Sequence, residues 1–147
     1  MAENVRILVI DDEPGVLESF KMILKIKDYE VTTFDNGTEA LASFEKGKYD
    51  IAFIDMKLQK EPVEVGPDFG LEVLKRLKAA DPDIEVIIVT AYATDTTHAN
   101  AITLGALEYL RKPFLMEEIY ELVERALRRR RAKTARKEEL GPLGPIH

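Results

Sequence analysis

Apolar residues follow two alternating patterns along this chain. Short apolar runs rich in β-branched or aromatic residues predict strands at residues 5–10, 29–34, 51–54, 85–90 and 107–110. Between and after these runs, apolar side chains recur every three or four residues, which predicts five helices. Strands that are largely apolar on both sides are typical of a parallel sheet covered by helices on both faces. The pattern therefore predicts an α/β fold, a single doubly wound five-stranded parallel sheet, with the flavodoxin-like strand order 2-1-3-4-5.

Charged and hydroxyl residues stand at the ends of the predicted strands. Asp11 and Asp12 follow the first strand, Asp55 follows the third, Thr90 closes the fourth, and Lys112 comes after the fifth. Each has an ordinary structural alternative, such as capping of the next helix by Asp11 or Asp12. In an open parallel sheet, however, ligands bind beyond the carboxyl ends of the strands. The sequence therefore predicts that three carboxylates, a hydroxyl and an ammonium group surround one crevice.

This combination of side chains indicates a site that binds and transfers a phosphoryl group. Carboxylates placed close together repel one another unless a cation neutralises them, and oxygen ligands of this kind suit Mg²⁺. The Lys112 ammonium and the Thr90 hydroxyl would bind the remaining oxygens of a phosphoryl group. Asp55 stands between these two groups and the metal ligands. It is the candidate nucleophile, because a carboxylate can accept a phosphoryl group as an acyl phosphate.

Composition limits the alternatives. A chain of 147 residues suffices for one domain, and the absence of cysteine excludes disulfides, thiolate catalysis and Cys-ligated metal sites. No apolar run approaches the roughly 18 residues of a membrane span, and the first residues lack the pattern of a secretory signal. We therefore expect a cytoplasmic protein without a membrane partner.

Charge is unevenly distributed along the chain. Residues 1–127 hold 14 basic and 25 acidic residues, whereas residues 128–137 hold seven basic residues and no acidic one. An acidic body suits a divalent cation better than nucleic acid, so direct nucleic-acid binding by this body is not expected. We expect a domain over residues 1–128, followed at 129–147 by a basic helical extension and a flexible tail. The extension is either solvated or a linker to an output domain outside this chain.

Four segments carry a resemblance to a known family. VRILVIDDEP (5–14), DIAFIDMKL (50–58), VIIVTAY (86–92) and GALEYLRKPF (105–114) together resemble the receiver domain of two-component response regulators. The resemblance covers most of the chain, and it implies a cis peptide bond between Lys112 and Pro113. It implies that Asp55 is the phosphoacceptor and that Lys112 binds the phosphoryl group. The implied Mg²⁺ ligands are Asp55, the Met56 backbone carbonyl, and either Asp11 or Asp12 or both. Thr90 and Tyr109 would be the switch residues.

The resemblance also implies a function and partners. Such a domain takes a phosphoryl group from the phosphohistidine of a sensor histidine kinase or a phosphotransfer protein. It is not an enzyme beyond catalysing its own phosphorylation and dephosphorylation. The surface of its fourth helix, fifth strand and fifth helix then changes and binds a partner or forms a phosphorylation-dependent homodimer. The alternative is a pseudo-receiver, a phosphorylation-independent protein-interaction module with the same fold.

The chain departs from the family pattern near the expected site. Gln59 stands where the family usually has proline, and Gly70 lies fifteen residues after Asp55, so the segment from Lys57 to Asp68 is longer than usual. In this family, the positions two residues after the phosphoacceptor and two after the switch hydroxyl tune self-dephosphorylation. Here they are Lys57 and Tyr92, whose size and charge are expected to slow it.

Overall fold

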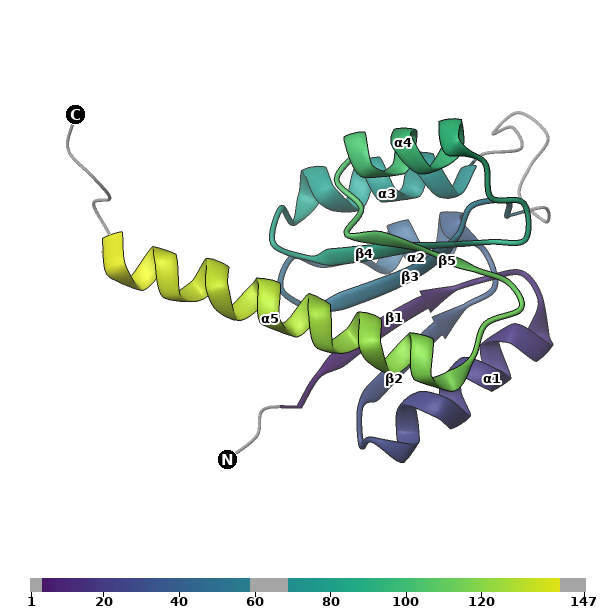
Figure 1. Cartoon of the computed structure of the whole chain (residues 1–147), viewed down its shortest axis with the longest axis horizontal. Helices are drawn as coiled ribbons and strands as arrows, with labels where there is room; N and C mark the ends of the chain where they lie inside the picture. Colours follow the sequence, from purple (N-terminus) through teal and green to yellow (C-terminus); the bar gives the residue numbers. More distant parts are fainter. Residues whose placement is uncertain (1–3, 59–68, 141–147) are drawn as a thin grey trace.

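Five parallel strands form one sheet in the order β2-β1-β3-β4-β5 (Figure 1). The computed structural model describes residues 4–58 and 69–140. The strands are β1 (Arg6–Ile10), β2 (Glu30–Phe34), β3 (Ile51–Asp55), β4 (Glu85–Thr90) and β5 (Glu108–Arg111). The helices are α1 (Pro14–Ile26), α2 (Gly37–Ser43), α3 (Phe69–Ala80), α4 (Asp95–Thr103) and α5 (Met116–Leu140). The order confirms the predicted flavodoxin-like fold.

The sheet separates two apolar cores. Helices α1 and α5 cover one face, and α2, α3 and α4 cover the other (Figure 1). Because successive strand residues point to opposite faces, Ile7 and Val9 of β1 pack with Phe20 of α1, whereas Leu8 and Ile10 pack with Leu74 of α3. Burial on both faces explains why the central strands are apolar along their whole length.

Local signals set the helix ends. Pro14 occupies the first turn of α1, where its missing N–H group costs no hydrogen bond. The Asn36 side chain caps α2 by accepting a hydrogen bond from the Glu39 amide at 2.8 Å. Gly105, which follows α4, has a φ of +106°, a backbone conformation that glycine adopts without strain. A glycine in this conformation just after the last helical residue is typical of a helix C-terminus.

Several strand ends differ from the prediction by one residue, and two boundaries have a clear structural reason. Strand β5 covers Glu108–Arg111 rather than residues 107–110, because backbone pairing with Thr90 continues past the last apolar side chain to Arg111. The polar stretch that begins at Lys57 would be expected to run as a loop up to Gly70, but Phe69 and Gly70 are already buried in α3. Residues 59–68 of this stretch, which include Gln59, lie outside the described residues.

The predicted basic extension is helical but not simply solvated. Helix α5 continues without a break from Met116 to Leu140 and extends beyond the body of the sheet (Figure 1). Four of its basic residues pair with acidic residues beside the amino-terminal ends of β3 and β4, namely Arg129, Arg130, Lys133 and Lys137. The predicted flexible tail, residues 141–147, lies outside the described residues. None of the described helices has the length and apolar character needed to cross a membrane.

Candidate functional site

Four carboxyl groups meet at the carboxyl ends of β1 and β3. Asp11, Asp12 and Glu13 follow β1, and Asp55 is the last residue of β3. One carboxylate oxygen from each of the four lies within 4.8 Å of the others. Asp11, Asp12 and Asp55 are buried, so water does little to screen their mutual repulsion. The structure thus brings the three predicted carboxylates together and adds Glu13.

Lys112 provides the positive charge within this group. Its Nζ atom lies 2.9 Å from Asp11 Oδ2, 3.1 Å from Glu13 Oε1 and 3.6 Å from Asp55 Oδ2. The Lys112 amide donates a hydrogen bond to the Thr90 carbonyl at 2.8 Å, and the bond to Pro113 is cis, as predicted. The loop after β5 thereby directs the ammonium group toward the ends of β1 and β3.

Burial and charge shift the titration of these groups. Burial, followed by the charge of Asp11, raises the pKa of Asp55 to about 7, against the opposing effect of Lys112. Burial also raises the pKa of Asp11. Burial acts to lower the pKa of Lys112, but its contacts with Asp11, Asp55 and Glu13 outweigh that effect and raise it. The ammonium is therefore held charged, while the carboxylates lack enough positive charge for full neutralisation.

The donor set fits a hard divalent cation. Asp11 Oδ2 is buried and accepts no hydrogen bond of normal geometry from the described residues, although the Lys112 ammonium lies beside it. Carboxylate oxygens at this spacing are the ligands that Mg²⁺ and Ca²⁺ prefer. The Met56 carbonyl, also predicted as a ligand, accepts a hydrogen bond from the Gly70 amide at 3.0 Å, so only its second lone pair is available. Its role as a ligand stays a prediction.

A pocket of about 210 Å³ opens beside this cluster. Its lining includes Asp12, Asp55, Thr90 and Lys112. Thr90 is buried at the end of β4, and its hydroxyl oxygen accepts a hydrogen bond from the Tyr92 amide at 3.1 Å. Among the described residues this hydroxyl donates to no acceptor. Its proton is therefore available to a ligand in the pocket.

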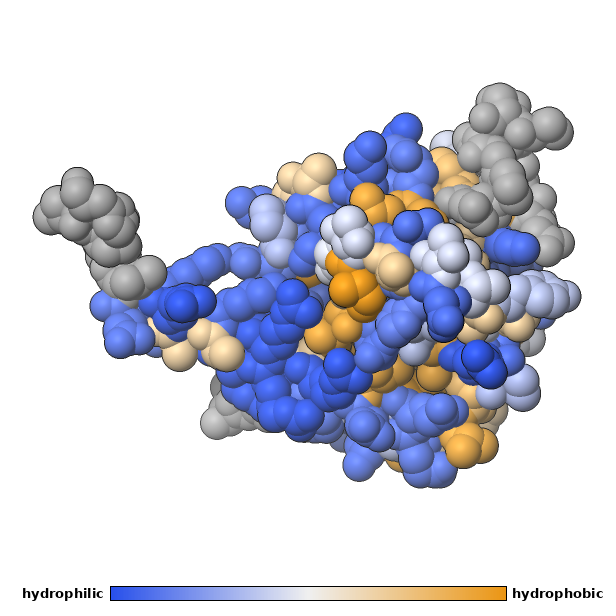
Figure 2. All heavy atoms as spheres, turned by 45° about the horizontal axis from the view of Figure 1, so that its top comes forward, coloured by the Kyte–Doolittle hydropathy of each residue, from blue (hydrophilic) through white to orange (hydrophobic). Residues whose placement is uncertain are grey.

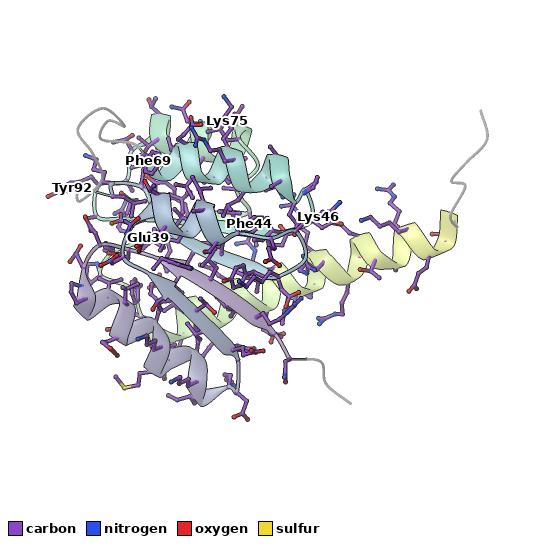
Figure 3. All side chains as sticks on the ribbon, turned by 180° about the vertical axis from the view of Figure 1, so that it is seen from behind. Glu39, Phe44, Lys46, Phe69, Lys75 and Tyr92 are labelled. Atoms are coloured by element: carbon purple, nitrogen blue, oxygen red, sulfur yellow. The ribbon has the colours of Figure 1, made fainter. Side chains whose placement is uncertain are left out.

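Two further predicted residues, Lys57 and Tyr92, lie together at the rim of this pocket. The Lys57 ammonium is 5.1 Å from the centre of the Tyr92 ring, a distance typical of a cation–π contact. Tyr92 is exposed and projects outward from this edge of the molecule (Figure 3). The contact forms one side of the entrance to Asp55.

Tyr109 does not lie in the pocket. It is half-buried, its ring lies 5.1 Å from that of His98, and its hydroxyl is 2.7 Å from the Thr97 hydroxyl. In this structure the predicted switch residue is therefore held against α4. Its inward turn stays a prediction.

Sequence reasoning missed two residues of the site. Glu13 directly follows the two predicted aspartates, and this run of three acids was the available signal. A Cβ atom on Gly70 would lie 2.1 Å from the Asp55 carbonyl oxygen and 2.6 Å from Met56 Cα. Only glycine permits this approach of α3 to the end of β3. The available sequence signal was that Gly70 directly precedes a helical pattern of apolar residues.

The comparisons with known proteins agree with this geometry. Residues 7–124 match the family described as the response regulator receiver domain. The chain is 35% identical over 124 residues to sporulation initiation phosphotransferase F of Bacillus subtilis, covering 84% of this chain and 94% of that protein. It spans between 22% and 58% of the length of several transcriptional regulatory proteins that it also matches.

Solved structures give the same result. A response regulator receiver domain protein (CheY-like) from Methanospirillum hungatei superposes with a TM-score of 0.79 at 28% identity, covering 89% of this chain and 99% of that one. A response regulator from Burkholderia pseudomallei superposes with a TM-score of 0.68 at 29% identity, covering 80% of this chain and 65% of that one. This chain belongs to the family of receiver domains of two-component response regulators.

Proposed function

We propose that this chain is a phosphoacceptor switch that receives a phosphoryl group on Asp55. The observation that carries the proposal is the position of the Asp55 carboxylate, which is buried between an acidic cluster and the Lys112 ammonium and lines a pocket. The B. pseudomallei relative was solved with a phosphorylated aspartic acid and a calcium ion. The same chemistry at Asp55 fits the groups around it.

The donor we propose is the phosphohistidine of a sensor kinase or phosphotransfer protein. An Asp55 oxygen attacks phosphorus, the phosphorus–nitrogen bond breaks, and the imidazole leaves with the bonding electron pair. The Lys112 ammonium, 3.6 Å from Asp55 Oδ2, stabilises negative charge on the transferred group, and the Thr90 hydroxyl donates its free proton to a phosphoryl oxygen. Both groups already lie at the pocket, so neither side chain has to move far before the transfer.

Asp11, Asp12 and Asp55 would hold the divalent cation, which we propose to be Mg²⁺. When bound, it would neutralise the carboxylates and the charge of the phosphoryl group. Closure of Thr90 on that group, with an inward turn of Tyr109, would break the Tyr109–Thr97 contact and change the surface of α4, β5 and α5. That surface would then bind a partner or a second copy.

Intact mass after incubation with acetyl phosphate and Mg²⁺ tests the proposal. We expect wild type and Asp35→Asn, which removes an exposed carboxylate, to gain one phosphoryl group that hydroxylamine releases. Asp55→Asn, and wild type in EDTA, are expected to gain none. If wild type gains none from small-molecule donors or a phosphorylated kinase, the chain is a pseudo-receiver. A gain that survives in Asp55→Asn would place the phosphoacceptor elsewhere.

A further inference from the structure

Helix α5 carries basic residues on the side that faces the sheet. The apolar residues Ile119, Val123 and Ala126 of this side are buried in the core. Further along the helix, the same side presents Arg130, Lys133 and Lys137, because residues spaced by three or four lie on one helix face. These three contact the acidic residues Asp50, Glu85 and Asp83, respectively. The basic half of the helix is therefore docked on the body of the protein.

The opposite side of α5 forms a stripe of exposed charges. Its members follow one another at spacings of four, three, four and three residues, namely Glu117, Glu121, Glu124, Arg128 and Arg131. This outer stripe is acidic in its first three positions and basic in its last two. Toward its C-terminal end the helix shows a hydrophilic surface (Figure 2). None of the five makes an ion pair with another described residue, and Glu124 lies within hydrogen-bonding reach of the Tyr29 side chain.

Because acidic residues precede basic ones along the outer stripe, two α5 helices that lie antiparallel bring the acids of each opposite the bases of the other. With the two-fold axis crossing the outer side of the helix at the height of residue 126, Glu124 of one copy faces Arg128 of the other, and Glu121 faces Arg131. By symmetry each pair occurs twice, which gives four pairs of opposite charge. A parallel arrangement in register would instead place like charges together. The exposed Ala132 and Ala135 add little bulk that would keep the two helices apart.

We propose that two copies of this chain associate through the outer stripes of α5 in this antiparallel register. The outer stripe lies beside the part of α5 nearer to β5, where Arg125 contacts Glu108 and Leu122 is buried. Glu121 borders both, because it lines a pocket together with Glu108 and Tyr109. This association needs no phosphoryl group, so it does not depend on the function proposed for Asp55. Because its contacts are exposed ion pairs, it is weak and sensitive to ionic strength.

Charge reversal tests the pairing. We expect sedimentation of the full chain to show a concentration-dependent dimer of the 16.7 kDa monomer at low ionic strength. It should dissociate when salt shortens the screening length from about 30 Å at 0.01 M to about 3 Å at 1 M. Glu121→Arg with Glu124→Arg, and separately Arg128→Glu with Arg131→Glu, should each be monomeric. An equimolar mixture of the two double variants should restore the dimer.

The folding of each variant is checked by circular dichroism, and cross-linking tests the register independently. Since the chain has no cysteine, the double variant Glu121→Cys with Arg131→Cys can form disulfides only at the introduced positions. Ten residues separate them, about 15 Å along the helix, so they cannot bond within one chain. We expect rapid oxidation to a covalent dimer.

The matched control is Glu117→Cys with Arg128→Cys, which lies about 10 Å out of the proposed register. It should cross-link much more slowly. Equal cross-linking rates in the two cysteine variants would contradict the antiparallel register. A wild type that stays monomeric at low ionic strength, or a mixture of the charge-reversal variants that stays monomeric, would overturn the proposed association.

Discussion

The Nζ atom of Lys133 lies 2.7 Å from a carboxylate oxygen of Glu85, although the two residues are 48 positions apart and the Glu85 side chain is fully buried. Arg129 lies on the other side of the same carboxylate, at 3.6 Å. A buried carboxylate is costly without such partners. The basic extension of α5 therefore supplies the charge that lets Glu85 begin β4 inside the protein.

Removing Lys133 should destabilise the domain. We expect Lys133→Ala to lower the free energy of unfolding by about 2 kcal/mol, because Glu85 loses its closest charged partner and keeps the more distant Arg129. Urea denaturation measures the change. Arg136→Ala, on an exposed position of the same helix, should change it by less than about 0.5 kcal/mol. Equal losses in the two variants would mean that the ion pair contributes nothing specific.

Gly70→Ala should be harmful because its Cβ atom would lie 2.1 Å from the Asp55 carbonyl oxygen. The start of α3 or the end of β3 must then move, and we expect a loss of about 3 kcal/mol in the free energy of unfolding. Asp55 should also accept phosphoryl groups more slowly. Gly15→Ala is the matched control, since a Cβ atom there meets nothing within 4 Å and should leave the protein as stable as wild type or more so. A harmless Gly70→Ala would show that α3 can shift freely.

The contact between Asp83 and Lys137 should make stability depend on acidic pH. The hydrogen bond from Lys137 is the main cause that lowers the pKa of Asp83 in the folded protein. Such a carboxyl stabilises the fold above its unfolded pKa of about 3.9, and this contribution is lost as the pH falls through the lower folded pKa. We expect wild type to be more stable than Asp83→Asn near neutral pH, with the difference disappearing below about pH 4.

A double-mutant cycle with Lys137→Met assigns this effect. If the two residues act as a pair, Asp83→Asn should have little further effect in the Lys137→Met background. Additive losses at neutral pH would contradict the pairing. Thermal unfolding between pH 2 and pH 7 provides both measurements.

Metal binding should reverse the relative stability of wild type and Asp55→Asn. In EDTA, we expect Asp55→Asn to be more stable by about 1 kcal/mol or more, because it removes one of four carboxylates whose oxygens lie within 4.8 Å. Saturating Mg²⁺ should stabilise wild type by about 2.7 kcal/mol at a hundred times its dissociation constant, and the variant by less. Asp35→Asn should behave as wild type. A Mg²⁺ response that is the same in all three proteins would exclude Asp55 as a ligand.

The contact of Lys57 with Tyr92 should affect the lifetime of the phosphorylated protein. Under the proposed function, Lys57→Ala or Tyr92→Ala opens the entrance to Asp55, so water should hydrolyse the acyl phosphate several times faster. Lys27→Ala is the control, because it removes a similar contact with Tyr120, 5.0 Å from its ring centre, away from the site. Loss of phosphate followed by intact mass measures the rates. Unchanged rates would show that neither side chain limits the access of water.

Much of the site could be predicted from sequence because it lies where apolar runs end. The carboxyl ends of parallel strands share one edge of the sheet, so identifying β1, β3 and β4 was enough to place Asp11, Asp55 and Thr90 near one another. The order of the strands was predicted because right-handed crossovers leave few topologies, of which the flavodoxin-like order is the commonest for a chain of this length. The family pattern then supplied the roles expected of these residues.

The sequence by itself thus determined the strands and the acids at their ends, since both follow from the local alternation of apolar and polar residues. The strand order followed from the general rules for parallel sheets with helical crossovers. Only the tertiary structure decided that Gly70 packs against Asp55 after a long intervening segment, and that Lys133 reaches the buried Glu85. Such contacts depend on distances between elements and on the path of each crossover. Periodicity within one segment carries no information about either, because it specifies which face is buried and not what that face will meet.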